Sequence, residues 1–513
     1  MKKLTKIITV LLVLAMMLSA LASCNAGTPD ESKPESSSST PESSSTPKPE
    51  ESKPDESDDE SDESTEDLEN WLPPKMDLDR EMNVLSGKLY YDEWLTKDDG
   101  DIVGTELYNR IPKTEQNLGI TLNVEIVTGT DLESFMQEVK KRHESTDPNM
   151  IADLVSSYSQ LAGSLTLEGR YQTINNSDYI DLENPWWPAD LLANSTIDDK
   201  VYFVSGDISP TLIYETYAIF YNVDLVERYN LGNPIELVNN KEWTLDKVIE
   251  LTSGIFQNLD NTDGVSTNDF LAFNFNDNAH LKAFPFAMGI RVILPDEDDG
   301  YVWSDLYMGG KMEIIADKMT NWIRNNNGVT SRGETGVGDY GVSFKQGNCI
   351  FTVGNFAYAA MYIAGAGINY GVVPCPLYDS DQENYYSYYG NPTSFWGIPT
   401  NAPDLDEACA LLEYLAAEAY VYISPALFER ALKLKYVTGQ VDGLSKMFDI
   451  IRDGLVFDAC MFYNRHVGSS YNGFSNLDQP PFSWSAGFTG FKVNMMNSTL
   501  QNDIVAKLRS LEY

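Results

Sequence analysis

The chain has 513 residues, of which 77 are acidic and 36 are basic, so its formal net charge is −41. This excess of acid excludes nucleic acid as a partner, because phosphate binding needs clustered lysine and arginine. Hydrophobic residues make up 42% of the chain, which is enough for a large core. The length predicts two domains or one bilobal domain.

Residues 1–23 have the pattern of an export signal. Three lysines precede an apolar run over residues 7–22, which is shorter than the roughly 20 apolar residues of a membrane-spanning helix. The sequence Leu-Ala-Ser-Cys over residues 21–24 resembles the lipobox of bacterial lipoproteins. The resemblance implies cleavage before Cys24 and acylation of its thiol. The protein would then be anchored at the outer face of the cytoplasmic membrane of a Gram-positive-type bacterium.

The segment that follows Cys24 is predicted to be a tether. Residues 25–70 consist almost entirely of Ser, Thr, Pro, Glu, Asp and Lys. Such a segment cannot bury enough apolar surface to offset its ordering entropy, so residues 24–70 are expected to be a lipidated cysteine followed by a disordered linker. Like charges extend such a linker. The folded part is then expected over residues 71–513.

The first part of this body alternates short strand-like runs with helical patterns. The apolar spacing predicts strands at Gly87–Tyr91, Ile120–Val127 and Ile151–Val155 and helices at Thr105–Leu118 and Asp131–Lys141. This order predicts a parallel sheet with helices on its faces.

The pattern continues to residue 419. Thr244 is a predicted N-cap, and later elements are expected at Lys311–Asn325 (helix), Cys349–Val353 (strand), Asn355–Ala364 (helix), Gly371–Val373 (strand) and Leu405–Ala419 (helix). Open α/β sheets bind ligands at the carboxyl ends of their strands. Ligand contacts are therefore expected just after Val155, Val204, Val353 and Phe395.

A series of motifs occurs in one order along the body. The series reads Gly206-Asp207-Ile208-Ser209, Tyr214–Tyr221, Asn222-Val223-Asp224-Leu225, Leu231-Gly232-Asn233-Pro234, Trp243-Thr244, Phe344–Asn348, Tyr370–Pro376, Ile398-Pro399, Leu432–Lys435 and Phe457-Asp458. Together these motifs resemble the family 1, carbohydrate-type, extracytoplasmic solute-binding proteins of ABC importers, over roughly Gly87 to Tyr463. The resemblance implies a two-lobed, periplasmic-binding-protein-like (type II) α/β fold. Its lobes would be formed from discontinuous segments, with a hinge and an interlobe ligand cleft.

Aromatic residues make up 12% of the chain, and flat rings bind the C–H faces of sugars while planar polar groups fix the hydroxyls. The aromatic candidates for ligand contact are Trp187, Tyr214, Tyr217, Trp303, Tyr358 and Trp396. Core packing is the alternative for each ring, but at least two are expected in the cleft. The polar candidates at expected strand ends are Ser157, Tyr158, Asp207 and Asn355, with Arg291 as a weaker one. Asp207 either accepts sugar hydroxyls or caps its loop.

The sequence contains no G-x-S-x-G, H-E-x-x-H or phosphate-loop motif. The stretch Asp260–Gly264 departs from a calcium loop, because Leu259 stands at the first ligand position. We therefore expect no metal and no cofactor. The wide, irregular spacing of Cys349, Cys375, Cys409 and Cys460 favours buried thiols over disulfides.

We therefore predict a lipid-anchored, monomeric binding protein. It would capture a carbohydrate, most simply an oligosaccharide, and deliver it to the permease subunits of an ABC importer by hinge closure. A surface polysaccharide-binding protein or a sensory receptor on the same fold is the alternative. A glycosidase stays open as a third hypothesis, because two carboxylates suffice for that chemistry.

Overall fold

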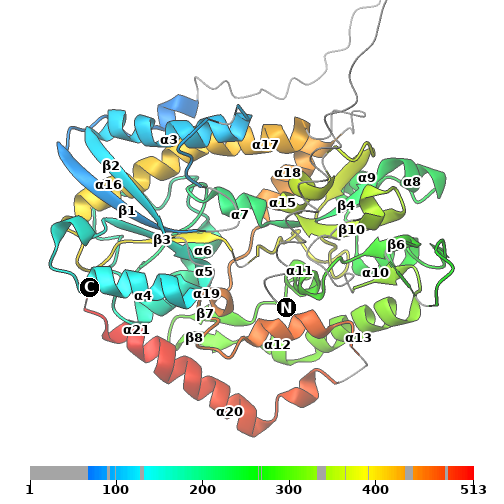
Figure 1. Ribbon diagram of the computed structural model, residues 1–513. Coiled ribbons are helices and arrows are strands. Elements are labelled where there is room, and N and C mark those ends of the chain that lie inside the picture. The colour runs from blue at the N-terminus through cyan, green and yellow to red at the C-terminus, as the bar shows by residue number, and fades with distance from the viewer. Residues whose placement is uncertain are drawn as a thin grey trace, which may run out of the picture. The chain divides into compact units, whose positions relative to one another are not determined.

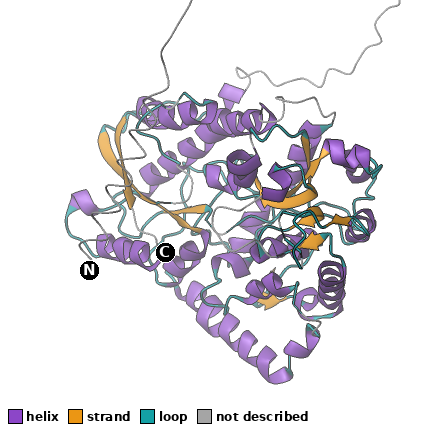
Figure 2. Ribbon diagram, turned by 45° about the vertical axis from the view of Figure 1, so that its right-hand side comes forward, coloured by secondary structure: helices purple, strands orange, loops and turns teal. Residues whose placement is uncertain are grey.

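The computed structural model describes residues 68–512, except 89–92, 99, 128–131, 264, 267, 332–341, 364, 391, 434–442 and 480–482. The predicted export signal, Cys24 and the predicted linker up to residue 67 lie outside the described residues. All described residues belong to one unit, Glu63–Tyr513. Figure 2 shows two separate groups of strands among the helices of this unit, and we call the two parts built on them lobe 1 and lobe 2.

Lobe 1 is built on a four-stranded sheet with the order β12-β3-β1-β2 (Figure 1). Its strands are β1 (Arg80–Gly87), β2 (Ile120–Val127), β3 (Leu154–Tyr158) and β12 (Ser394–Gly397). β1 is parallel to β2 and β3, as the alternation of strands and helices predicts, whereas β12 is antiparallel to β3. Between β1 and β2 runs α3 (Ile102–Leu118), which begins where the Asp101 side chain accepts a hydrogen bond from the Gly104 N–H. It ends at Gly119, whose φ is 65°.

Lobe 2 is built on the sheet β11-β4-β10-β6-β5, with β9 paired to β6. Its strands are β4 (Tyr217–Asn222), β5 (Phe256–Gln257), β6 (Phe270–Asn274), β9 (Val329–Thr330), β10 (Cys349–Asn355) and β11 (Tyr370–Val373). β4 is antiparallel to both of its neighbours. All residues of β4 and β11 are buried, so the centre of the lobe is apolar on both faces of the sheet.

Most other elements are helices. They are α4 (Leu132–His143), α5 (Ser159–Leu167), α6 (Ala189–Ser195), α7 (Pro210–Tyr214), α8 (Val223–Arg228), α9 (Pro234–Asn239), α10 (Leu245–Leu251), α11 (Ala283–Ala287), α12 (Asp305–Met308), α13 (Gly310–Asn325), α14 (Val342–Lys345), α15 (Phe356–Tyr358), α16 (Leu405–Glu418), α17 (Ser424–Lys433), α18 (Leu444–Asp453), α19 (Ala459–Phe462), α20 (Gly490–Thr499) and α21 (Ala506–Ser510). A hairpin is formed by β7 (Ile293–Asp296) and β8 (Gly300–Trp303).

The chain passes between the lobes at residues 215–216, at 389–390 and 392–393, and at 454–458, and these crossing segments are bonded to one another. Thr216 and Tyr389 form a β-bridge, and the Gly390 N–H donates to the Glu215 carbonyl over 2.9 Å. The Ser387 N–H donates to the Gly454 carbonyl over 2.7 Å. The lobes therefore meet at a set of connecting segments that are hydrogen-bonded to one another, which we call the hinge.

The carboxyl-terminal helices add a further connection. α21 contacts α5 of lobe 1, and the segment Leu500–Val505 contacts β8. In Figure 1 α20 and α21 are red and lie below α4, β8 and α12.

The predicted elements agree with the structure where apolar spacing is regular. β2 has the predicted bounds, and the Thr244 side chain caps α10 by accepting from the Lys247 N–H. The predicted strand Gly87–Tyr91 is misplaced, because β1 ends at Gly87 and residues 89–91 lie outside the described part. In β1, the buried Met82 and Val84 are separated by the polar Asn83, which is the alternation of a strand. The four cysteines are buried free thiols, which confirms that prediction.

Candidate functional site

The polar edges of the two sheets meet at the crossing segments. In lobe 1, Tyr158 at the carboxyl end of β3 pairs with Ser394 at the start of β12. In lobe 2, Asn355 at the carboxyl end of β10 pairs with Tyr217 at the start of β4. The Ser159 N–H donates to the Thr393 carbonyl, which joins the first edge to the second crossing. Strand ends of both lobes therefore border the same hinge, where open α/β sheets bind ligands.

Glu215 lies in the first crossing, between α7 and β4. Its carboxylate accepts a hydrogen bond from the Asn355 side-chain amide over 2.9 Å, and the residue is 4% exposed. Burial raises the pKa of Glu215 to about 7, and the bond from Asn355 offsets part of that rise. The Asn355 Oδ1 in turn accepts from the Tyr358 N–H over 2.8 Å, so the amide is held in one orientation.

Gly390 allows the second crossing to pass close to this carboxylate. A Cβ at Gly390 would lie 2.3 Å from Glu215 Oε2, a separation that atoms of a side chain cannot adopt. The side chain of Glu215 is therefore enclosed by one crossing segment, the end of β10 and its own backbone. We call Tyr158, Glu215, Tyr217 and Asn355 the hinge site.

Aromatic rings pack around Tyr217 of the hinge site. The Tyr217 ring meets the His280 ring edge-on at 5.2 Å and lies 5.3 Å from the Tyr388 ring. Burial lowers the pKa of His280, so this ring is uncharged near neutral pH. Tyr158 is half-buried on the lobe 1 side. The hinge site thus combines a carboxylate, an oriented amide and phenol rings.

Asp207 joins the two lobes near the hinge. Its loop precedes α7 in lobe 1, and its two carboxylate oxygens each lie 3.1 Å from an Arg452 guanidinium nitrogen. Arg452 is on α18, which packs against β11 of lobe 2. The Ser424 hydroxyl also donates to Asp207, which is 8% exposed. Its neighbour Asp207 raises the pKa of Arg452.

Comparison with known proteins identifies the family of the chain. Residues 102–422 match the model of the bacterial extracellular solute-binding proteins. The chain belongs to this family. No curated protein shows significant similarity to this solute-binding protein.

Solved structures of sugar-binding proteins share its fold. The cyclic α-maltosyl-1,6-maltose binding protein from Arthrobacter globiformis has a TM-score of 0.52 and 13% identity, covering 84% of this chain and 99% of that one. The GacH receptor of Streptomyces glaucescens, solved unliganded and with acarbose, has a TM-score of 0.51 and 12% identity at the same coverage. The maltose-binding periplasmic protein MalE from Listeria monocytogenes, in complex with maltose, has a TM-score of 0.50 and 16% identity, again at 84% and 99%.

Four residues predicted from the sequence lie beside the crossing segments of this solute-binding protein. Tyr158, Tyr217 and Asn355 belong to the hinge site, and the half-buried Tyr214 precedes Glu215 at the end of α7. Asp207 is nearby, but its carboxylate is engaged by Arg452 rather than capping its own loop. A ligand would have to displace that arginine to reach it.

Two predicted tryptophans lie inside lobe 1 instead. Trp396 is fully buried, and its indole N–H donates to Ser209 Oγ over 3.0 Å. The prediction placed it after a carboxyl strand end, but β12 is antiparallel, so the end of β12 that faces the hinge is Ser394. Trp187 is 3% exposed and donates to Glu413 over 3.0 Å. Their burial gives both rings a core role.

The remaining predicted residues do not belong to the hinge site, although the Tyr358 backbone N–H donates to Asn355. Ser157 is 1% exposed, and the Tyr358 ring packs closely over Gly354. Trp303 stacks with Tyr307 at 6.2 Å and lines a groove beside α20. The Arg291 guanidinium lies 4.6 Å from the centre of the Tyr386 ring.

Sequence reasoning missed Glu215. The residue stands in Tyr214-Glu215-Thr216-Tyr217, an acid between two tyrosines just before a run of buried residues. An acidic residue at the entry to a fully apolar strand was the available signal, because a carboxylate in such a place needs a partner.

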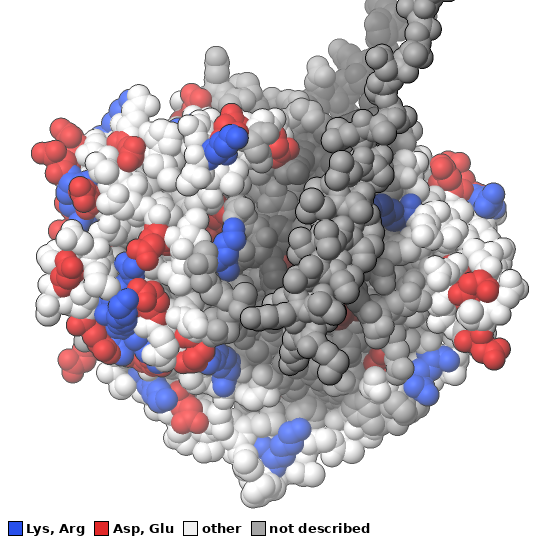
Figure 3. All heavy atoms as spheres, in the orientation of Figure 1, with Lys and Arg blue, Asp and Glu red and all other residues white. Residues whose placement is uncertain are grey.

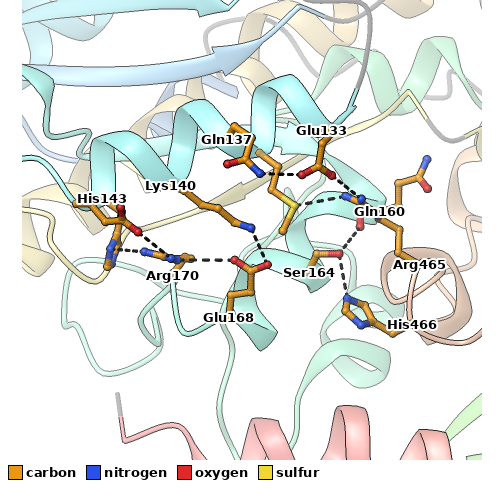
Figure 4. Close-up of polar contacts among 12 residues, drawn as sticks. Glu133, Gln137, Lys140, His143, Gln160, Ser164, Glu168, Arg170, Arg465 and His466 are labelled. Carbon is orange, nitrogen blue, oxygen red and sulfur yellow. Dashed lines mark hydrogen bonds and ion pairs between the residues drawn. The ribbon is translucent and has the colours of Figure 1, made fainter.

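A second polar cluster lies on the outside of lobe 1 (Figure 4). Lys140 of α4 pairs with Glu168 at 3.0 Å, and the Arg170 guanidinium lies 2.9 Å from the His143 ring nitrogen. Ser164 Oγ lies 3.1 Å from a ring nitrogen of His466. Ser164 is 2% exposed, so this pair presents no nucleophile to a ligand and serves to join α5 to the segment after α19.

Charges elsewhere are dispersed. Acidic and basic side chains are interspersed over the described part of the face in Figure 3. Among the described residues, no three His, Cys, Asp or Glu side chains are grouped so as to hold a metal ion. No helix in the described ranges has the length and apolarity needed to span a bilayer.

Proposed function

We propose that this solute-binding protein captures a neutral oligosaccharide at the hinge site and delivers it to an ABC importer. The observation that carries the proposal is the Glu215–Asn355 pair, 2.9 Å apart at the crossing between the two strand edges. A carboxylate oxygen and an oriented amide accept and donate hydrogen bonds to sugar hydroxyls. The half-buried rings of Tyr158 and Tyr214 would supply flat apolar surface for the C–H faces.

Closure of the lobes is the proposed mechanism of capture. Tyr158 belongs to lobe 1 and Asn355 to lobe 2, so a ligand that touches both stabilises the arrangement in which they are close. The hinge-bonded crossing segments allow such a rotation without breaking either sheet. The permease subunits would then recognise the closed form. No covalent chemistry is part of this proposal, and the protein acts as a monomer.

The names of the fold relatives support a sugar as the ligand class. They bind maltose, acarbose and a cyclic maltosyl-maltose according to their descriptions. Their identity to this chain is 16% or less, so the particular sugar has to be found by experiment.

A thermal-shift screen of the unacylated full chain against oligosaccharides tests the ligand. A sugar at 100 times its Kd stabilises the protein by about 2.7 kcal/mol. The proposal is supported if one sugar class raises the melting temperature, if Glu215→Gln loses this effect, and if the sugar is recovered unchanged. A shift that E215Q leaves intact contradicts the assignment of the site. Turnover of the sugar would instead indicate a glycosidase, and a shift with peptides alone would refute the carbohydrate class.

We also propose that acylation of Cys24 anchors the protein to the outer face of the cytoplasmic membrane. The support is the Leu-Ala-Ser-Cys sequence after a charged and apolar leader. Metabolic labelling with a fatty acid should mark the wild type and leave Cys24→Ser unlabelled. Equal labelling of both would refute the anchor.

A further inference from the structure

A groove of about 810 Å³ lies on the outer side of lobe 2, away from the crossing segments. Its walls are α13 and the end of α10 with the following turn at residues 253–256. Both helices are seen at the right of Figure 1. Its apolar lining residues are Ile249, Phe256, Ile314 and Trp322.

One stripe of α13 faces this groove. Ile314, Asp317, Asn321 and Asn325 follow one another at intervals of three or four residues, and all are exposed lining residues. Residues so spaced lie on one side of a helix. An exposed helix stripe usually carries lysine and glutamate for solubility, whereas this one presents two amides, one carboxylate and an isoleucine. Asn327, beyond the helix end, extends the row.

The lining is held in place by hydrogen bonds that do not use these amides. The Trp322 indole N–H donates to Thr252 Oγ1 over 2.9 Å, and the Asn326 amide donates to the Thr252 carbonyl over 3.0 Å. Asn326 also accepts from the Gly328 N–H over 3.0 Å. The turn and the buried tryptophan are thus fixed before any ligand arrives, which lowers the entropic cost of binding.

The groups on the rim are left for a ligand. Within the described part of the chain, the side chains of Asp317 and Asn327 make no hydrogen bond, and the side chains of Asn321 and Asn325 bond only to each other, over 3.4 Å. Each amide offers two donors and one acceptor oxygen. The one lysine of the rim, Lys318, is held by Asp246 at 2.7 and 2.8 Å. Among the described lining residues there is thus no unpaired cation and one unpaired carboxylate, Asp317, which disfavours anionic ligands. Amides and a carboxylate beside apolar side chains fit a neutral polyhydroxyl compound, whose hydroxyls both donate and accept.

We propose that this groove is a second binding site, for a neutral glycan segment. The ligand class rests on the proposed function of the hinge site, but the residues are different. Amides bind hydroxyl pairs at the rim while Ile249, Phe256 and Ile314 contact C–H faces. Such a site would hold a polysaccharide on the protein surface, separate from the hinge site.

Two measurements on the unacylated full chain separate the sites. The first is calorimetry with the oligosaccharide found in the thermal-shift screen. The second is migration in native gels containing the matching polysaccharide: soluble starch for maltodextrins, xylan for xylo-oligosaccharides and galactomannan for manno-oligosaccharides. The groove variant is N321A/N325A, and the matched control is N494A/N497A, which removes two exposed amides from α20. Alanine favours helix at all four positions.

We expect N321A/N325A to lose about tenfold in apparent affinity for the polysaccharide gel, the size of two lost hydrogen bonds. Its calorimetric affinity should stay within about twofold of wild type. E215Q should lose calorimetric affinity for the oligosaccharide and keep its retardation in the polysaccharide gel. N494A/N497A should match wild type in both the gel and the calorimetry.

Retardation that N321A/N325A keeps, or a wild type that no polysaccharide retards, would overturn the second site and leave the hinge site standing. Retardation lost in the groove variant with no oligosaccharide binding anywhere would overturn the hinge-site function and support the groove.

Discussion

Replacing Arg452 by alanine tests the ion pair that joins the lobes. The Asp207 side chain is 8% exposed, whereas the Arg452 side chain is 34% exposed. Without the arginine, the buried carboxylate retains the Ser424 hydroxyl. Exposed ion pairs contribute up to about 1 kcal/mol, and removing one partner of a fully buried pair costs about 3–5 kcal/mol. A pair with one buried member lies between, so we expect R452A to lower the free energy of unfolding by about 2 kcal/mol.

Asp207→Ala should cost less, because the guanidinium that remains is one-third exposed and hydrated. A double-mutant cycle of R452A and D207A isolates the pair, and we expect a coupling energy of about 1 kcal/mol or more. Urea unfolding followed by tryptophan fluorescence measures all four proteins. Small-angle scattering with and without ligand then reports whether losing the pair changes the balance between open and closed forms.

Arg465→Ala is the matched control. Arg465 has the same 34% exposure as Arg452, but its partner Glu133 is 55% exposed. Water can therefore replace the arginine, and the loss should be smaller than in R452A. Equal losses in R452A and R465A, or a coupling energy of zero between Asp207 and Arg452, would refute the reasoning from burial.

Three further predictions concern the hinge site and the core. The pKa of Glu215 rises from 4.5 to about 7 on folding, so between these pH values the folded state keeps a proton that the unfolded state has released. The free energy of unfolding should therefore fall by up to about 3 kcal/mol as the pH rises through this window. Unfolding curves at a series of pH values should show a flatter slope for E215Q. Ligand affinity should rise as the pH rises through about 7, because the Glu215 carboxylate then becomes an acceptor. Calorimetry should show that Asn355→Ala loses about tenfold or more in ligand affinity. If the dependence of affinity on pH is the same in this variant as in the wild type, the Glu215–Asn355 pair is not responsible for it. Trp396→Ala should cost about 3–5 kcal/mol through the cavity it leaves, while Trp396→Phe should keep ligand affinity within about twofold; a large loss in a stably folded Phe variant would show that the ring does touch the ligand.

The sequence predicted the elements best where a pattern is local. The apolar spacing of Ile120–Val127 and the cap at Thr244 depend on neighbours within one turn or one strand, and both are correct. Parallel pairing of β1 with β2 and β3 follows from the intervening helices, and it too is confirmed. The family also followed from the order of the motifs, and the match over residues 102–422 confirms it.

The site residues were harder, because strand direction is set by partners far away in the chain. Trp396 is predicted as a ligand contact because it follows Phe395 at an expected carboxyl strand end. However, β12 pairs antiparallel with β3, which lies more than 200 residues earlier, so its other end faces the hinge. The pairing of Asp207 with Arg452 depends on α18, which no local pattern relates to that loop. Glu215 could not be predicted as a site residue, because its partner Asn355 is distant in the sequence and adjacent only in the folded sheet.

The placement of β12 has a consequence for biosynthesis. All strands of the lobe 2 sheet lie between Tyr217 and Val373, whereas the lobe 1 sheet must wait for Ser394–Gly397. During synthesis the ribosome therefore completes every strand of lobe 2 before lobe 1 receives its edge strand. Closing a loop of well over 200 residues makes that last pairing a slow, non-local step. Until then β3 has an unpaired edge, which other chains can join, so the earliest part of the chain to emerge depends longest on protection from aggregation.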